Sequence, residues 1–167
     1  DFPDGNMTLV GTPTLFIDGE WCASSDGGRR PTYNPYDASV IMHVDEATSN
    51  DARRAIAAAK AFFSSSDWSR RSYQDRCELL NRMADSLQKN KAELARIETI
   101  DTGKTLGESE IDIDDVTNVF RFYAKEALKL AEDKRVTGPL VPESVKSLIV
   151  HEPVGVCVLI TPWNYPI

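Results

Sequence analysis

The stretch that decides the fold is VGVCVLITPWNYP, residues 154–166. Residues 154–160 are continuously apolar, with no alternation between polar and apolar positions. Such a run is typical of a strand that is covered on both faces, as in a parallel sheet. The turn-like sequence TPWNYP follows at once, and open α/β folds bind ligands at the carboxyl ends of their parallel strands. We therefore predict an α/β fold with a ligand-binding turn at residues 161–166.

Short strand segments are expected upstream of this run. A hairpin is predicted at LFIDGEWC, because Asp18-Gly19 is a typical two-residue hairpin turn. The PTYNP sequence is expected to be extended, since the residue before a proline is disfavoured in the α region. A later strand is expected after a turn marked by Gly138, Pro139 and Pro142. In chain order, the predicted β segments are residues 15–22, 31–35, 39–44 and 147–150.

Between residues 48 and 130, apolar residues recur at helical spacing. A first helix is predicted after the capping candidates Thr48 and Ser49, ending in the serines 64–66. A second begins near Ser72, and its apolar stripe resumes further on and stops at Gly103, a residue suited to a helix end. A third long helix, with acidic residues toward its start, carries on one face Val116, Val119, Phe120, Tyr123, Ala127 and Leu130.

Composition excludes several classes of protein. The chain has 167 residues and a net charge of −7, which argues against binding to nucleic acid phosphates. No run approaches the roughly 18–20 apolar residues of a membrane span. The first residues, DFPDGNMTLVG, lack the basic and apolar segments of a secretory signal. The expectation is an acidic cytoplasmic protein that binds neither nucleic acid nor membrane.

Cysteine usage and motifs give little chemistry of their own. Cys22, Cys77 and Cys157 are too few and too far apart for a disulfide framework, and no CxxC pair suggests zinc. Cys157 lies within the apolar run, where burial of a thiol favours a packing role over a nucleophilic one. Nucleotide-binding and hydrolase signatures such as GxGxxG, GxxxxGK[ST] and GxSxG are absent.

One resemblance covers nearly the whole chain from Leu15. EPVGVCVLITPWNYP at 152–166 is similar to the sequence that opens the cofactor-binding domain of the NAD(P)-dependent aldehyde dehydrogenase superfamily. Matching segments occur in family order at 15–21, 34–35, 67–87 and 93–109. ETIDTGKTL and ITPWNYP together resemble most the betaine aldehyde dehydrogenases. Val158-Leu159 departs from the Gly-Gln pair that many relatives carry.

The resemblance implies roles for the turn. It assigns to Asn164 the amide that donates a hydrogen bond to the substrate oxygen as negative charge develops there. It places NAD or NADP against the strip Ile160, Thr161, Pro162 and Trp163. From the residues alone, Asn164 could instead be a simple turn residue, and Ile160 could pack in a core.

A cation site is a second implication. Many relatives hold K⁺ or Na⁺ with an aspartate that matches Asp101 and carbonyls that match Thr32 and Tyr33. Such ions prefer oxygen ligands, and helix C-termini favour cations. The alternative is that Asp101 is exposed to solvent and has Lys104 as its counter-charge.

The resemblance also implies three regions and missing parts. Residues 1–134 correspond to the N-terminal, mostly helical part of the cofactor-binding domain, 135–153 to an oligomerisation-arm β segment, and 154–167 to the first strand of a Rossmann-like parallel sheet with its turn. The nucleophilic cysteine and general-base glutamate are expected beyond residue 167. The 167-residue chain by itself is therefore expected to be inactive.

Two function classes stay open. The first is a segment of a dehydrogenase that oxidises a small aldehyde, such as betaine aldehyde, to the carboxylate within a homodimer or homotetramer. The second is a non-catalytic binding or assembly module of the same ancestry. Continuation of the protein into a region bearing the cysteine and the glutamate would distinguish them.

Overall fold

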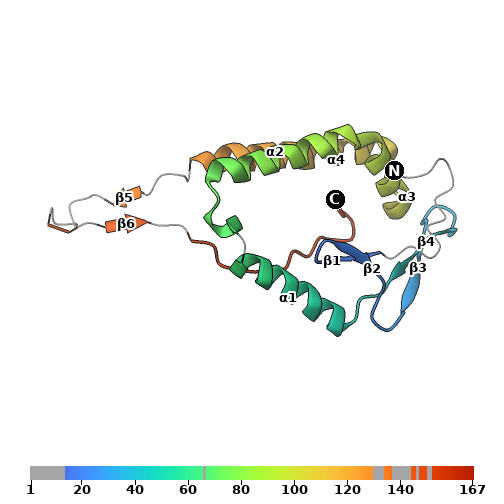
Figure 1. Cartoon of the computed structure of the whole chain (residues 1–167). Helices are drawn as coiled ribbons and strands as arrows, with labels where there is room; N and C mark the ends of the chain where they lie inside the picture. The colour runs from blue at the N-terminus through green and yellow to red at the C-terminus, as the bar shows by residue number, and fades with distance from the viewer. Residues whose placement is uncertain (1–13, 66, 130–133, 137–143, 146, 150–151) are drawn as a thin grey trace.

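The computed structural model describes residues 14–65, 67–129, 134–136, 144–145, 147–149 and 152–167. Figure 1 shows paired helices along one side, a further helix with small hairpins along the other, and a projecting hairpin at one end. In chain order the elements are β1 (Leu15–Ile17), β2 (Glu20–Cys22), β3 (Arg29–Tyr33), β4 (Val40–Asp45), α1 (Ser49–Ser65), a 3-10 turn (Asp67–Arg70), α2 (Tyr73–Lys89), α3 (Lys91–Thr102), α4 (Leu106–Leu128), β5 (Lys134–Val136) and β6 (Ser147–Ile149). The predicted turn at 137–143 and the residues Leu130 and Val150 lie outside the described residues.

Helix boundaries confirm the capping predictions. Thr48 precedes α1, and its hydroxyl accepts the backbone N–H of Asp51 at 3.3 Å. Ser72 caps α2 in a reciprocal capping box with Asp75. Helix α3 ends at Gly103 in the left-handed conformation with φ 80°. These local signals fixed the helix ends because each satisfies backbone groups that the helix itself leaves unpaired.

The third predicted helix begins earlier than its acidic residues suggested. Thr105 and Glu108 form a second capping box, so α4 starts at Leu106. Asp112 therefore lies in the second turn of α4, where it pairs with Lys104. The carboxylate of Asp112 therefore pairs with the ammonium of Lys104 and not with the unpaired N–H groups at the start of the helix.

The core lies between α2, α3 and α4, which pack against one another. The apolar side chains that are fully buried there are small or medium in size: Cys77, Ala84, Ala95, Ile113 and Ala124. Small residues let the helix backbones approach closely, so α2 runs alongside α4 in Figure 1. Among the described residues, no helix is both long and apolar enough to cross a membrane.

The small strands form three separate antiparallel pairs. In β1–β2, Asp18 and Gly19 have φ values of 57° and 82°, the positive pair that a type I′ turn requires. The β3–β4 pair contains a register shift between Thr32 and Tyr33. The β5–β6 pair projects from the body of the molecule (Figure 1).

Residues 154–160 correct one expectation. They run as extended chain outside the sheets of the described residues, and the side chain of Leu159 is 88% exposed. A strand needs hydrogen-bonded neighbours, and the parallel neighbours that this apolar pattern demands are not among the described residues. Cys157 is accordingly exposed, where burial was expected.

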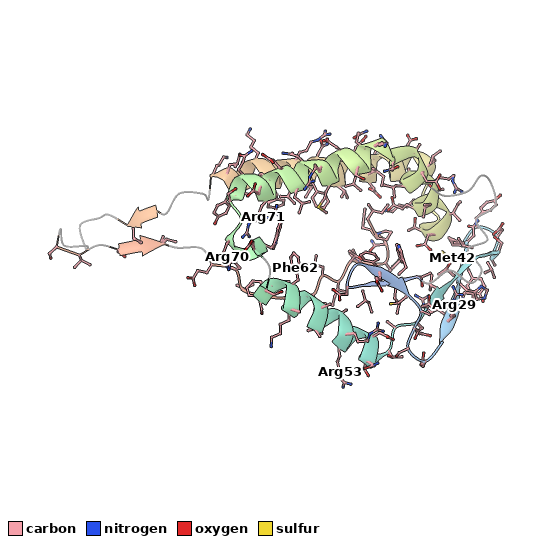
Figure 2. All side chains as sticks on the ribbon, in the orientation of Figure 1. Arg29, Met42, Arg53, Phe62, Arg70 and Arg71 are labelled. Atoms are coloured by element: carbon pink, nitrogen blue, oxygen red, sulfur yellow. The ribbon has the colours of Figure 1, made fainter. Side chains whose placement is uncertain are left out.

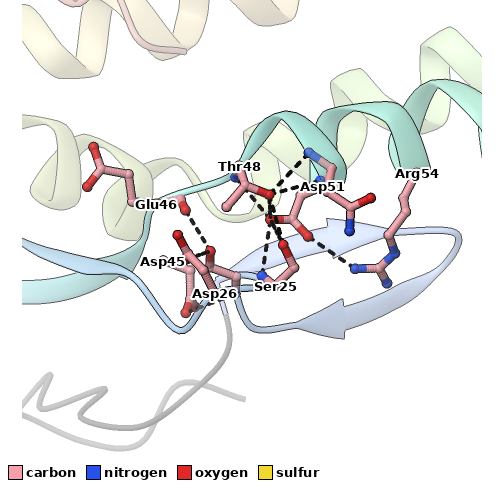
Figure 3. A network of polar contacts seen from close by, with 9 residues as sticks. Ser25, Asp26, Asp45, Glu46, Thr48, Asp51 and Arg54 are labelled. Carbon is pink, nitrogen blue, oxygen red and sulfur yellow. Dashed lines mark hydrogen bonds and ion pairs between the residues drawn. The ribbon is translucent and has the colours of Figure 1, made fainter.

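A polar network ties the first hairpin to α1 (Figure 3). The carboxylate of Asp51, only 1% exposed, accepts the N–H of Thr48 at 3.0 Å and that of Ser25 at 3.1 Å. Arg54 donates to the same carboxylate at 3.2 Å. Nearby, the carboxylate of Asp45 accepts the N–H of Thr14 at 2.8 Å. The backbone N–H groups of Thr48 and Ser25 hold the pKa of Asp51 below its usual range. The backbone N–H of Thr14 does the same for the pKa of Asp45.

Replacing Asp51 by Asn should destabilise the protein in a pH-dependent way. A carboxyl whose pKa is lowered by folding stabilises fully above its unfolded pKa of about 3.9, and the benefit disappears as pH falls through the lower folded value. The variant should therefore unfold at lower urea than the wild type at pH 7. The difference in stability between the variant and the wild type should narrow below pH 4. Asp115→Asn, at an exposed site on α4, is the control, and equal stability of Asp51→Asn and wild type at pH 7 would contradict the assignment.

Gly103→Ala should cost about 1–2 kcal/mol of stability, because the left-handed conformation crowds a Cβ. The added Cβ would also lie 2.9 Å from the Pro35 ring. Gly107→Ala is the matched control, since its Cβ meets open space on a helix and should stabilise by about 0.5–1 kcal/mol. Urea denaturation measures both, and equal effects of the two substitutions would refute the strain at Gly103.

Candidate functional site

The TPWN sequence ends in a hydrogen-bonded turn. The backbone N–H of Tyr165 donates to the carbonyl of Pro162 at 3.2 Å. This closes a four-residue turn in which Asn164 occupies the third position. The side chain of Asn164 is exposed, so its amide is available to a ligand. The structure is thus compatible with both interpretations of Asn164, a turn residue and a hydrogen-bond donor.

The predicted cofactor strip leads into this turn. The side chains of Ile160 and Trp163 are 89% and 88% exposed. Thr161 and Pro162 are exposed as well. Among the described residues, Ile160 has no core to pack in, so its core-packing interpretation stays a prediction. The strip presents both side chains and backbone to the surroundings.

Lys104 forms a charged centre beside the turn. Its ammonium lies 3.0 Å from Oε1 of Glu98, which comes from α3, and pairs with Asp112, which comes from α4. The same ammonium lies 4.0 Å from the centroid of the Tyr165 ring. Burial lowers the pKa of Lys104, but hydrogen bonds to Asp112 and Glu98 outweigh this, and the net shift is upward.

Sequence reasoning missed this centre. As the alternative to a cation site it paired Lys104 with Asp101, whereas the structure pairs Lys104 with Glu98 and Asp112. The sequence did not single out Glu98, because the same helix also carries acidic residues that are only partly buried, such as Glu93. A signal was nevertheless present: Glu98 follows Ala95 by three positions, on the face that is buried.

The predicted cation ligands come from two segments that meet. Thr32 and Tyr33 lie at the irregularity of β3, and Asp101 lies exposed in the last turn of α3. The close approach of Gly103 to Pro35 brings the end of α3 to the end of β3. An irregularity leaves backbone groups outside the regular ladder, and oxygen donors suit an alkali cation. In the part of the chain that the structure describes, His, Cys, Asp and Glu side chains form no metal-binding group of three.

An apolar groove of about 380 Å³ lies beside residues 153–157, which precede the cofactor strip in the chain. It is formed by α1, the 3-10 turn and α2 on one side and residues 153–157 on the other. Phe62 belongs to its wall, and Figure 2 labels it on α1, with Arg53 pointing away from the molecule. The Trp68 ring in the same wall has the guanidinium groups of Arg71 and Arg76 over it, each 5.7 Å from the centroid.

Comparison with known proteins identifies the family of the chain. The model of the aldehyde dehydrogenase family matches residues 21–167. The chain belongs to the aldehyde dehydrogenase family. Within that family, it is 42% identical to betaine aldehyde dehydrogenase of Bacillus subtilis over 154 residues, covering 92% of this chain and 31% of that enzyme.

Further relatives show the same relation. Peroxisomal aminoaldehyde dehydrogenase 2 of Pisum sativum is 39% identical over 160 residues, covering 94% of this chain and 32% of that protein. The crystal structure of Staphylococcus aureus betaine aldehyde dehydrogenase with NAD⁺ superposes with a TM-score of 0.81 at 42% identity, over 90% of this chain and 29% of the other. The chain thus spans about a third of these relatives and adopts the fold of their N-terminal part.

Lys104→Met should destabilise the protein by about 3–5 kcal/mol, because it leaves a buried carboxylate without its cation. The Glu98 side chain is 1% exposed, and its Oε2 already has no hydrogen-bond partner among the described residues. Lys91→Met removes a more exposed pair with Asp114 and should cost about 0–1 kcal/mol. Thermal unfolding of both variants tests the difference, and similar costs would show that Lys104 is not the cation on which Glu98 depends.

Proposed function

We propose that this chain is the N-terminal segment of an NAD(P)-dependent aldehyde dehydrogenase that oxidises a small polar aldehyde to its carboxylate. The observation that carries the proposal is the exposed amide of Asn164, held in a hydrogen-bonded turn at the end of the cofactor strip. Family membership supports the reaction class. Relatives named betaine aldehyde and aminoaldehyde dehydrogenases support a substrate with a positively charged or polar group.

The proposed chemistry needs a thiolate that attacks the aldehyde carbon, followed by hydride transfer and hydrolysis of the thioester. The proposal takes the nucleophile and the general base from beyond residue 167, as the relatives' greater length allows. Cys157 is not proposed as the nucleophile, since the described residues that line its groove include no histidine or carboxylate that could activate it.

Asn164 stabilises the charge that attack creates. As the thiolate adds, the aldehyde oxygen becomes negative, and the amide N–H of Asn164 donates to it without giving up a proton. A preorganised donor strengthens as charge develops, so it lowers the barrier more than it tightens substrate binding. The closing hydrogen bond from Tyr165 to Pro162 supplies that preorganisation.

The cofactor assignment rests on Ile160, Thr161, Pro162 and Trp163. NAD is favoured because solved relatives with this fold contain NAD⁺; the cofactor supplies the hydride acceptor. Thr161 and Trp163 are exposed residues whose backbone carbonyl and N–H groups could bind a ribose, and the exposed Trp163 offers an apolar face. The acidic residue that selects NAD over NADP is proposed to lie outside residues 1–167.

Asn164→Ala in the complete protein should lower kcat by ~10²–10³, the usual loss for one oxyanion donor. Asn164→Asp should be at least as damaging, because a carboxylate would face the developing negative charge. Cofactor affinity should stay near that of the wild type, since the backbone of residues 161–163 is unchanged. Steady-state kinetics with a cofactor titration measures both, with Asn118→Ala, an exposed amide on α4, as control. Retained turnover, or a loss of cofactor binding in proportion to rate, would make Asn164 a turn residue only.

The cation site is a further part of the proposal. We place K⁺ or Na⁺ between the carboxylate of Asp101 and the carbonyls of Thr32 and Tyr33, supported by the contact between Gly103 and Pro35.

Thermal stability should accordingly rise in KCl relative to choline chloride at equal ionic strength, because the ion binds only the folded state. Asp101→Asn should remove that rise, and Asp115→Asn should keep it. Equal melting temperatures of the wild type in the two salts would dismiss the site.

The alternative is a non-catalytic assembly module, which the projecting β5–β6 hairpin favours (Figure 1). In the enzyme proposal the same hairpin is the oligomerisation arm of a homodimer or homotetramer. It lies in the chain between the helical region ending at 134 and the apolar segment beginning at 154. The intact mass of the native protein decides: a chain of family length with a cysteine and a glutamate beyond residue 167 supports the enzyme. We infer a cytoplasmic location from the acidic composition and the three free cysteines.

A further inference from the structure

We infer that two carboxylates hold the ammonium of Lys104 away from Asp101 and so leave the Asp101 carboxylate open to the alkali cation. The two carboxylates are those of Glu98 and Asp112. The inference rests on the cation site proposed above and concerns how that site is kept open. Lysine and the cation compete, because both are positive and both bind carboxylate oxygens. Glu98 and Asp112 are positioning residues here, and neither touches the cation.

The corner at the end of α3 gives Lys104 two acidic neighbours on that helix. Lys104 follows Gly103, which ends α3 in the left-handed conformation with φ 80°. Asp101 stands three residues after Glu98, and residues three apart are neighbours on a helix surface. Lysine carries its charge on a flexible stem. An ammonium that contacts Glu98 therefore has Asp101 as the neighbouring carboxylate of the same helix.

The structure shows the ammonium directed elsewhere. Nζ of Lys104 lies 3.0 Å from Oε1 of Glu98, and Asp112 of α4 forms the second ion pair. The Lys104 side chain is only 18% exposed, so both pairs lie largely out of water, where salt screens them less. Among the described residues, Asp101 is exposed and takes part in no ion pair. Its carboxylate is thus left without a lysine as counter-charge.

Asp112 decides the direction in which the ammonium points. It comes from the second turn of α4, whereas Glu98 and Asp101 both belong to α3. Burial opposes the charge of Lys104, but hydrogen bonds to Asp112 and Glu98 raise its pKa on balance, so the side chain is a full cation at neutral pH. Without Asp112, that cation would keep Glu98 and gain Asp101 as its second partner. It would then compete with K⁺ for the Asp101 carboxylate.

The test measures the K⁺ concentration that half-saturates the stabilisation of the complete protein. Melting temperatures are followed as KCl replaces choline chloride at constant ionic strength, because an ion that binds only the folded state stabilises it by mass action. Asp112→Ala releases Lys104 and places a good helix former in α4. We expect its half-saturating K⁺ concentration to rise on the order of 3-fold, the scale of one competing, partly exposed ion pair.

Asp114→Ala is the matched control. It removes the same charge from α4, two residues further along the chain. The lysine that it releases is Lys91, the first residue of α3, whereas Asp101 lies in the last turn of that helix. Asp114→Ala should therefore keep the half-saturating K⁺ concentration of the wild type.

A second background separates competition by the lysine from a general effect of charge. The double variant Glu98→Gln/Lys104→Met removes the competing ammonium together with one of its carboxylates. Asp112→Ala added to this double variant should leave the half-saturating K⁺ concentration unchanged, because no lysine remains to be released. In the wild-type background the same substitution should raise it.

The outcomes distinguish this inference from the cation site on which it rests. If KCl does not stabilise the wild type, the site fails and the inference fails with it. If KCl stabilises the wild type and Asp112→Ala keeps the same half-saturation, the site survives and the role of Asp112 is overturned. Equal weakening by Asp112→Ala and Asp114→Ala, or by Asp112→Ala with and without Lys104, would also overturn it. Should Asp112→Ala not fold, Asp112→Asn, which keeps the shape without the charge, should shift half-saturation in the same direction, and no shift would overturn the inference.

Discussion

The ammonium of Lys104 lies between one carboxylate from α3 and another from α4, and against a ring from the end of the chain. Two neighbouring helices and one residue that is distant in sequence, Tyr165, therefore meet at one charge. The arrangement is demanding, because a buried carboxylate such as Glu98 tolerates neither the loss nor the displacement of its cation. Lys104 thus joins the end of α3, the start of α4 and the residue that follows Asn164.

A second group of carboxylates joins the small hairpins to one another and to α1. Asp51 binds backbone N–H groups of both its own helix cap and the segment after β2, while Asp45 joins Thr14 to β4. In both places a single acidic side chain replaces the apolar contacts that such small hairpins cannot provide. Figure 3 shows how closely these groups are gathered at the start of α1. The strands are thus attached to the helices by polar bonds more than by a shared core.

How much of this could be predicted depends on the range of the interactions concerned. Helix ends at Thr48, Ser72 and Gly103 were predictable, because a cap is determined by residues within one turn of it. The partners of Lys104 were not, since Asp112 becomes a neighbour only after α4 has turned back beside α3. The strand predicted at 154–160 is not formed for a related reason. Its apolar pattern requires parallel neighbouring strands, and the described residues do not include them. For Asn164 the sequence predicted a turn and a role, and the structure bears on the turn alone.

The groove between α1 and residues 153–157 bears on how the chain folds while it is being synthesised. Ribosomes add about 5–20 residues per second, and domains fold from their N-terminal side as synthesis proceeds. Helices α1 and α2 and the 3-10 turn are complete before residues 153–157 emerge, and they already offer Phe62 and Trp68 as an apolar wall. The first part of the nascent apolar segment, residues 154–157, thus has an apolar surface to pack against. Residues 158–160 do not line this groove, and Leu159 is almost fully exposed among the described residues.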